Sequence, residues 1–177
     1  MEVNNLFGPA GVELLLAMLI GIITVYLTKT VLMNFYMKKT SESNPYGNLA
    51  FMIFLSGTIF SVALIMFGVI EPLSATFKVL NASGEDGSSY LISCMQYVGI
   101  FLTLGYVFSA LIVFIAYKLF SMMTTQLNEY EEIRDGNAGV AILLVTLTII
   151  TALFVKEPFM VYLESLIPYP DVPNIMG

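Results

Sequence analysis

The sequence of 177 residues contains no histidine and a single cysteine, Cys94. One cysteine excludes a disulfide within the chain, and the cysteine and histidine spacing that holds zinc or haem is absent. Without histidine, general-base catalysis near neutral pH would need a glutamate or lysine with a strongly shifted pKa. No nucleophile–base pair, phosphate-binding loop or dinucleotide-binding fingerprint occurs either. We therefore expect a protein that is not an enzyme and has no metal site and no other cofactor.

Charged residues are also scarce, at 11% of the chain, whereas 58% of the residues are hydrophobic. Soluble domains carry about a quarter charged residues, so an aqueous globule is not expected. Only seven residues are lysine or arginine, against thirteen acidic residues, and no basic stripe is present that would neutralise the phosphates of a nucleic acid. The apolar residues come in blocks that short polar connectors separate, which is typical of an α-helical membrane protein.

Four segments have the roughly 20 apolar residues that a helix needs to cross a hydrocarbon core about 30 Å thick. They are residues 11–37, 49–70, 90–123 and 138–155. We expect the first to be a retained span, because it lacks the basic start and the small-residue cleavage site of a signal peptide. The sequence thus predicts an all-α integral membrane protein with four transmembrane helices.

Lysine and arginine in short loops favour the cytoplasmic side of a membrane. Five of the seven basic residues flank the connectors 38–47 and 121–136, whereas Lys78 and Lys156 fall on the opposite side. This bias predicts a multi-pass protein of the inner (plasma) membrane, with these two connectors in the cytoplasm and both termini outside.

The two halves of the chain share landmarks in the same register. Each half has a lysine late in its first span and a Gly-Asn pair before its second span, and the copies of each landmark lie 89 positions apart. The landmarks are Lys29 and Lys118, and Gly47-Asn48 and Gly136-Asn137. Glu71-Pro72 and Glu157-Pro158 close the second spans. We therefore predict two parallel copies of a helical hairpin, residues 1–92 and 93–177.

Each landmark has a physical interpretation. The lysines can extend their ammonium groups toward the cytoplasmic headgroups. Each asparagine suits a helix N-cap, where its side chain accepts a bond from an otherwise unpaired N–H, and each glycine before it tolerates a left-handed backbone. Pro72 and Pro158 suit the first turn of a new helix. The segments that follow them have apolar residues at helical spacing, which predicts short interfacial amphipathic helices whose apolar faces meet lipid or the bundle.

Three acidic residues are candidate functional groups. Glu13 lies inside the first span near its outer end, and is either a proton or cation site or a hydrated carboxylate at the interface. Glu71 and Glu157 form a pseudo-symmetric pair at the outer surface. They could bind a cation or a lipid amine, or they could simply favour the dipole at a helix start.

Small residues are candidates for helix packing. The stretches GTIFS and GYVFS each place glycine and serine four residues apart, at Gly57 and Ser61 and at Gly105 and Ser109. Such pairs permit close contact between transmembrane helices, and the alternative is that they line a pore.

The stretches GNLAFMIFLSGTIFSVAL and GNAGVAILLVTLTIITAL carry a resemblance to a family. The chain resembles the uncharacterised bacterial inner-membrane proteins typified by YjfL, a domain of unknown function with tandem two-helix membrane repeats. Gly57 lies where that family favours a small residue, whereas the second copy departs with Val145-Thr146-Leu147. The resemblance implies a fold and a location in the membrane, but it implies no catalysed reaction. Because members are often encoded near PspA-like membrane-remodelling proteins, it also implies envelope maintenance or stress, with a cytoplasmic membrane-remodelling partner.

Two functions remain open. The first is a non-enzymatic scaffold that self-associates as a homo-oligomer or joins other membrane-protein subunits, which the small-residue faces and the acidic connector QLNEYEEIRDG favour. The alternative is a small ion channel or carrier with a path between hairpins of an oligomer, which requires Glu13, Glu71 or Glu157 to face a water-filled cavity. Membrane lipids are expected partners in both cases, and nucleic acid in neither.

Overall fold

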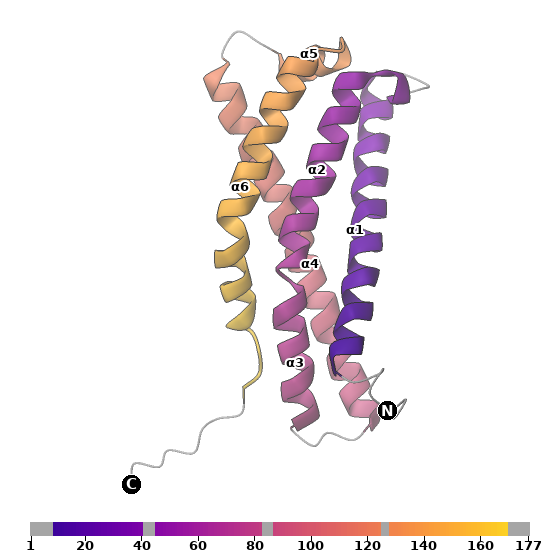
Figure 1. Ribbon diagram of the computed structural model, residues 1–177, viewed down its shortest axis with the longest axis vertical. Helices are drawn as coiled ribbons and strands as arrows, with labels where there is room; N and C mark the ends of the chain where they lie inside the picture. Colours follow the sequence, from indigo (N-terminus) through magenta and orange to yellow (C-terminus); the bar gives the residue numbers. More distant parts are fainter. Residues whose placement is uncertain (1–8, 41–44, 83–86, 125–127, 170–177) are drawn as a thin grey trace.

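The computed structural model describes residues 9–40, 45–82, 87–124 and 128–169, and this part of the chain is helical without a strand. The helices in chain order are α1 (Pro9–Thr40), the short 3-10 helix η2 (Pro45–Gly47), α2 (Leu49–Phe67), α3 (Ile70–Ala82), α4 (Gly87–Met123), α5 (Glu129–Arg134) and α6 (Ala138–Glu164). They form an up-and-down bundle in which α1 flanks α2, and α4 crosses behind α2 and α6 (Figure 1). We name the two ends of the bundle after the helices found there, the α5 end and the α3 end.

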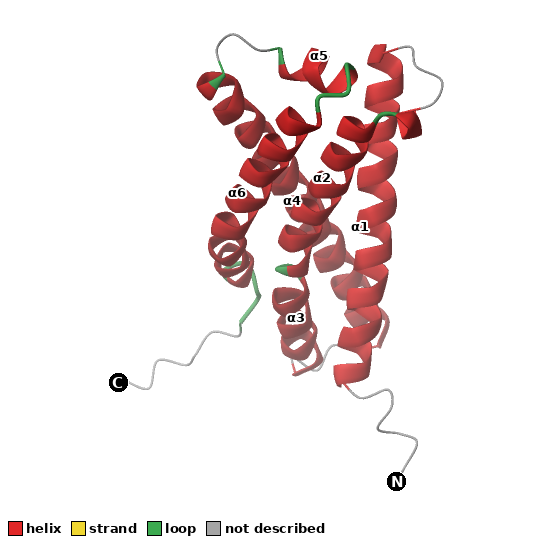
Figure 2. Ribbon diagram, turned by 45° about the horizontal axis from the view of Figure 1, so that its top comes forward, coloured by secondary structure: helices red, strands yellow, loops and turns green. Residues whose placement is uncertain are grey.

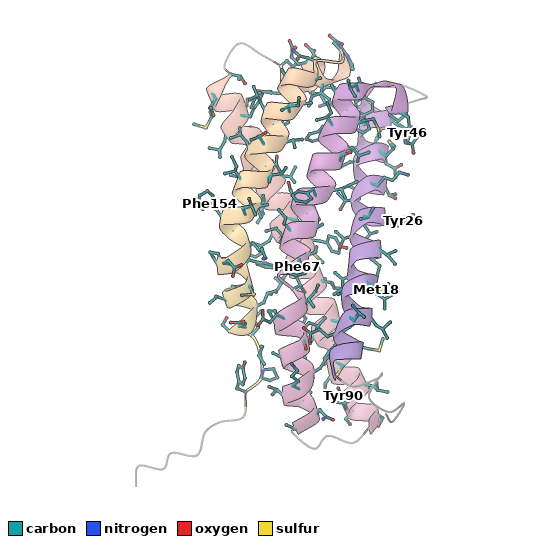
Figure 3. The ribbon with its side chains drawn as sticks, viewed as in Figure 1. Met18, Tyr26, Tyr46, Phe67, Tyr90 and Phe154 are labelled. Atoms are coloured by element: carbon teal, nitrogen blue, oxygen red, sulfur yellow. The ribbon has the colours of Figure 1, made fainter. Side chains whose placement is uncertain are left out.

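Four stretches of the described chain are long and apolar enough to cross a membrane, with α2 and α3 counted together. They are Glu13–Lys39, Leu49–Ala82, Ser88–Met123 and Ala138–Glu164. Large apolar side chains cover the outside of the bundle, where Met18 and Phe154 point away from the other helices (Figure 3). Lipid accommodates such a surface and water does not. The protein is therefore a multi-pass membrane protein, and the predicted all-α fold with four transmembrane helices is confirmed.

The second span consists of two helices that meet at Gly68. α2 ends at Phe67 with Gly68 as its C-cap, and α3 begins at Ile70. Glu71 and Pro72 lie in the first turn of α3, where the missing N–H of proline leaves no bond unmade. The chain is thus interrupted at this point without turning back, and α3 continues lengthwise below α2 (Figures 1 and 2).

α3 is the amphipathic segment that the sequence predicts after Pro72. Its apolar face meets the bundle: Leu73, Thr76 and Leu80 are buried, and α3 packs against α4, α1 and α6. The Thr76 hydroxyl donates to the carbonyl of Pro72 at 2.8 Å, so the buried polar group is satisfied within its own helix.

The fourth span runs further than the sequence predicts, because α6 continues through Pro158 to Glu164. Pro158 has no N–H to donate to the carbonyl of Phe154, and a proline inside a helix is costly. Beyond the proline, however, Phe159 and Leu163 are buried in the core, at 2% and 0% exposure. Their burial stabilises the last turns of α6. The separate amphipathic helix predicted to begin at Pro158 therefore does not form.

α2 and α6 share the most extensive helix contact in the described bundle. Gly57 of α2 leaves no room for a side chain, because a methyl group there would collide with Val145 of α6. In the predicted repeat Val145 corresponds to Ser56, and the valine supplies the side chain that fills this space. Gly105 of α4 makes room for Met66 in the same way, since a methyl carbon at Gly105 would lie 2.6 Å from the Met66 Sδ.

The serines of the two small-residue pairs are buried as well. Ser61 donates to the carbonyl of Gly57 at 2.9 Å, and Ser109 donates to the carbonyl of Gly105 at 2.7 Å. All four small residues therefore lie inside one copy of the chain, where they bring α2 close to α6 and α4.

Candidate functional site

The three candidate acids, which come from three different helices, line one cavity of about 550 Å³ at the α3 end of the bundle. Glu13 comes from α1, Glu71 from α3 and Glu157 from α6. Two lysines, Lys78 of α3 and Lys156 of α6, line the same cavity. The structure thus gathers five charged side chains from three segments that are far apart in the sequence.

The interruption between α2 and α3 forms one wall of the cavity. Gly68 lies there, and a methyl group at this residue would be 3.6 Å from the Lys156 Cγ and 3.2 Å from the carbonyl oxygen of Ile65. The stem of Lys156 therefore lies against the end of α2 at Gly68. A positive charge is favourable beside the carboxyl end of a helix, so the position suits Lys156.

Lys156 is held by two neighbours. Its Nζ lies 3.4 Å from the Glu157 Oε1 and 5.2 Å from the centroid of the Phe67 ring. The lysine side chain is 25% exposed and that of Glu157 is 65% exposed. The pair is thus partly open to solvent, and each charge is balanced by the other.

Glu13 connects α1 to α3. Its Oε2 accepts a hydrogen bond from the Ser74 hydroxyl at 3.2 Å, and Ser74 is buried whereas Glu13 is half-buried. Neither Glu13 nor Glu71 has an ion pair among the described residues. The carboxylates of Glu13 and Glu71 therefore form no ion pair with a lysine or arginine of the described chain.

The cavity holds three carboxylates and two ammonium groups, so it carries one more negative than positive charge. No three acidic residues in the described part of the chain lie close enough together to hold a metal ion. The arrangement instead suits a larger group that has an ammonium for Glu13 and Glu71 and an anionic part for Lys78. A small zwitterion has this chemistry.

Lys78, Lys156 and Ser74 also line the cavity, but the sequence alone does not identify them as candidate site residues. A signal for two of them is visible along α3, where Glu71, Ser74 and Lys78 are spaced i, i+3 and i+7 and so lie on one face of the helix. Lys156 adjoins Glu157 in the sequence, but only the close approach of α6 to Gly68 shows that it enters the cavity.

At the α5 end, Asn48 caps α2 and joins the two halves of the chain. Its side-chain oxygen accepts from the Phe51 N–H at 2.9 Å. Its side-chain nitrogen has three acceptors within hydrogen-bond distance for its two hydrogens, the carbonyls of Ile133 and Arg134 at 3.0 and 2.8 Å and the Tyr36 hydroxyl at 3.1 Å. One side chain thus satisfies the start of α2 and the last carbonyls of α5.

The second Gly-Asn pair has fewer connections. Asn137 caps α6 by accepting from the N–H groups of Gly139 and Val140, and it also donates to Glu132 at 2.6 Å. Gly136 has a φ of +88°, in the left-handed region that favours glycine. Gly47, by contrast, ends the 3-10 helix and has no positive φ, so the predicted need for a left-handed backbone applies only to the second copy.

The landmark lysines lie on the outside of the bundle and not in the cavity. The Nζ of Lys29 is 5.8 Å from the Tyr46 ring centroid, and that of Lys118 is 5.8 Å from the Phe114 ring centroid. Near them, a hydrogen bond from Arg134 to Asp135 at 3.1 Å raises the pKa of Arg134, so this guanidinium remains charged.

A family model described as Domain of Unknown Function (DUF350) matches residues 3–158 of the chain. The match includes all three acids of the cavity and both Gly-Asn pairs. It confirms the expectation of an uncharacterised family of unknown function, whereas the likeness to YjfL itself stays an expectation. No curated protein and no solved structure matches the chain.

Proposed function

The chain belongs to the family described as Domain of Unknown Function (DUF350), and we propose that it is a non-enzymatic membrane protein that binds a small zwitterion. The binding site is the cavity of Glu13, Glu71 and Glu157, and the protein acts as a small carrier or channel subunit. The observation that carries this proposal is the meeting of three carboxylates and two lysines in one cavity of about 550 Å³.

The depth of the cavity supports this role. α6 has an uncharged run from Ala138 to Val155, which at 1.5 Å per residue spans about 27 Å, close to the thickness of the hydrocarbon core. Lys156 and the cavity thus lie at the boundary opposite the α5 end. The lysine and arginine bias favours an outer location for this boundary, in the inner (plasma) membrane of the cell and with both termini outside.

The core beside the cavity supports a carrier rather than an open pore. Between the cavity and the α5 end the bundle interior is filled by apolar residues, among them Val62, Ile65 and Met66. A charged solute would not cross this region in one copy without movement of the helices. A path between the copies of a homo-oligomer is the other route that this proposal allows.

Binding of defined solutes to the purified full-length protein tests the proposal. We expect phosphoethanolamine, which has both an ammonium and a phosphate group, to bind more tightly than choline, which lacks an anionic group, in isothermal titration calorimetry. Glu71→Gln should weaken phosphoethanolamine binding by at least about tenfold, because a charge-assisted hydrogen bond is lost. Glu131→Gln, at the other end of the bundle, is the matched control and should bind as the wild type does. Equal binding by the two variants, or no binding of either solute, would overturn the proposal.

A scaffold is the second candidate, and the surface of α1 favours it. Only 17% of the most apolar stretch of α1 is buried inside the copy, compared with 22% in α4, 28% in α6 and 50% in the span that contains α2 and α3. A second copy or another membrane-protein subunit could cover α1, and the acidic α5 end could meet a cytoplasmic membrane-remodelling partner in envelope maintenance or stress. The small-residue pairs no longer support this role, since they are buried within one copy.

Disulfide crosslinking in membranes tests the scaffold. In a Cys94→Ser background, Tyr26→Cys on the outside of α1 should give crosslinked dimers, whereas Phe154→Cys on the outside of α6 should not. Dimers from both positions, or from neither, would contradict a specific interface on α1.

A further inference from the structure

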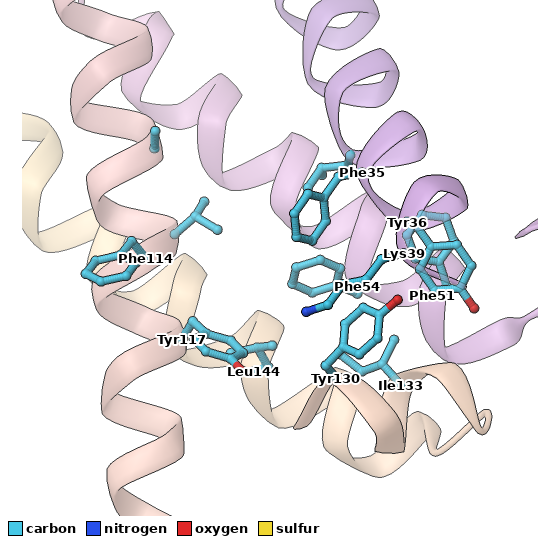
Figure 4. Close-up of a pocket in the computed structure, with 13 residues that line it drawn as sticks. Phe35, Tyr36, Lys39, Phe51, Phe54, Phe114, Tyr117, Tyr130, Ile133 and Leu144 are labelled. Carbon is cyan, nitrogen blue, oxygen red and sulfur yellow. The ribbon is translucent and has the colours of Figure 1, made fainter. Parts of the chain in front are cut away.

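A second cavity lies at the α5 end, far from the charged one. It has a volume of about 390 Å³, and its lining is apolar and aromatic except for Lys39 and the hydroxyls of three tyrosines (Figure 4). A further apolar cavity of about 420 Å³ shares Leu32, Ala110 and Val113 with it and continues toward the middle of the bundle. Together the two cavities form a groove between α1 and α4, with α2 as its floor.

The groove exists because α1 and α4 separate toward the α5 end (Figures 1 and 2). The two helices still meet at mid-bundle, where the Thr24 hydroxyl lies 3.2 Å from the Tyr106 hydroxyl. α1 packs mainly on α2, whereas α4 packs on α6 and α2. The groove is therefore open along its side to the lipid that surrounds the bundle.

The length of the groove equals the depth of one lipid leaflet. Its lining on α4 runs from Tyr106 to Tyr117, which is about 16 Å at the rise of an α-helix. Half of a hydrocarbon core is about 15 Å. The groove thus has the length of an acyl chain that spans one leaflet, and its apolar lining suits such a chain.

The end of the groove near α5 carries a positive charge. The Lys39 Nζ lies 4.0 Å from the centroid of the Tyr130 ring and points into the cavity between Phe54, Tyr117 and Tyr130 (Figure 4). Lys39 has no ion pair in the described part of the chain. The nearby Glu129 is buried, accepts a hydrogen bond from Thr124 and does not line the cavity.

We propose that an anionic phospholipid binds in this groove, with one acyl chain between α1 and α4 and its phosphate beside Lys39. The charge of the ammonium matches the phosphate, and the apolar lining below it matches the chain, in the order in which a lipid of the α5-side leaflet presents them. This site is separate from the charged cavity, so its test is independent of the proposed solute binding.

Tryptophan fluorescence gives the first test, because the chain has no tryptophan of its own. Phe114→Trp places one indole in the groove, and Phe154→Trp places one on the outside of α6 as a control. The full-length variants are reconstituted in phosphatidylcholine vesicles that contain increasing amounts of brominated phosphatidylglycerol, whose bromines quench tryptophan. We expect half-maximal quenching of the groove tryptophan at an at least fivefold lower fraction of the brominated lipid. Equal quenching of both variants overturns the proposal.

Lys39 is tested in the same assay. In the Phe114→Trp variant, the preference is measured as stronger quenching by brominated phosphatidylglycerol than by brominated phosphatidylcholine. Lys39→Gln should remove this preference. Lys38→Gln, which changes a lysine outside the groove, should keep it. A preference that survives Lys39→Gln shows that the phosphate does not bind at this lysine.

Blocking the groove gives a second measurement that needs no tryptophan. Ala110 is exposed and lines both cavities, so Ala110→Leu fills the groove without crowding the core. We expect native mass spectrometry of the detergent-purified chain to show at least fivefold less retained phospholipid for this variant, at an unchanged unfolding temperature. Undiminished lipid retention would show that the lipid is held elsewhere.

Discussion

α2 and α6 each begin at an asparagine that caps the helix, and they pack against each other at the centre of the bundle. Their other ends differ. α2 stops at Phe67 and a second helix follows after Gly68, whereas α6 continues past its own proline to Glu164. The difference matters because the first turn of α3 brings Glu71 to the place where the continuous α6 brings Lys156 and Glu157. The charged cavity therefore forms where α2 is interrupted and α6 is continuous.

The same asymmetry is present within the helix contact. Gly57 of α2 receives Val145 of α6, so a small residue in one half of the chain packs against a large one in the other half. The contact between the halves therefore depends on the positions at which the predicted repeats differ.

The largest effect is expected from Gly57→Val, because the added side chain collides with Val145. We expect a loss of about 3 kcal/mol in the free energy of unfolding, the upper range for overpacking a core. Titration of SDS into the detergent-solubilised protein measures it. The double variant of Gly57→Ala with Val145→Ala should be more stable than Gly57→Ala alone. If Val145→Ala instead lowers the stability of Gly57→Ala further, the space at Gly57 is not filled by Val145.

The two capping asparagines should differ in the same assay. Asn48→Ala removes a cap and the bonds to two carbonyls of α5, so we expect a loss of about 2 kcal/mol. Asn137→Ala removes a cap and one exposed bond, and we expect about 1 kcal/mol. Equal losses would mean that the connection of Asn48 to α5 contributes nothing to stability.

The two prolines should respond in different ways. Pro158→Ala restores an N–H inside α6, and we expect a gain of about 1 kcal/mol in stability, less than the full cost of an interior proline. Pro72→Ala lies in a first turn and should change stability by less than about 0.5 kcal/mol. The unfolding midpoints of the two variants measure this, and a larger gain at Pro72 would contradict the assigned helix boundaries.

The spans and the starts of the helices could be predicted from local features. Apolar runs of sufficient length identify the four membrane helices, and Asn48 and Asn137 mark helix starts because an N-cap is a local interaction. The course of α6 beyond Pro158 could not be predicted in this way, because it depends on the burial of Phe159 and Leu163 by other helices. The predicted boundary of the repeats at residues 92 and 93 falls inside α4, and the duplication itself stays a prediction.

The candidate acids could be predicted one by one but not as a group. Glu13 and Ser74 meet only because α1 and α3 lie side by side, and no spacing in the sequence records that contact. Lys156 enters the cavity because α6 packs beside the end of α2 at Gly68. The sequence thus indicates which residues are unusual, and tertiary packing decides which of them meet.

Thiol labelling of Ala75→Cys tests most directly whether the interrupted helix opens a hydrated, negatively charged cavity. Ala75 lines the cavity, and the variant is made in a Cys94→Ser background and reconstituted in vesicles of known orientation. We predict that a membrane-impermeant cationic thiol reagent reacts at least about tenfold faster than an anionic reagent of similar size, and that Glu71→Gln reduces this ratio. A thiol that does not react, or that reacts at equal rates with both reagents, would contradict the account.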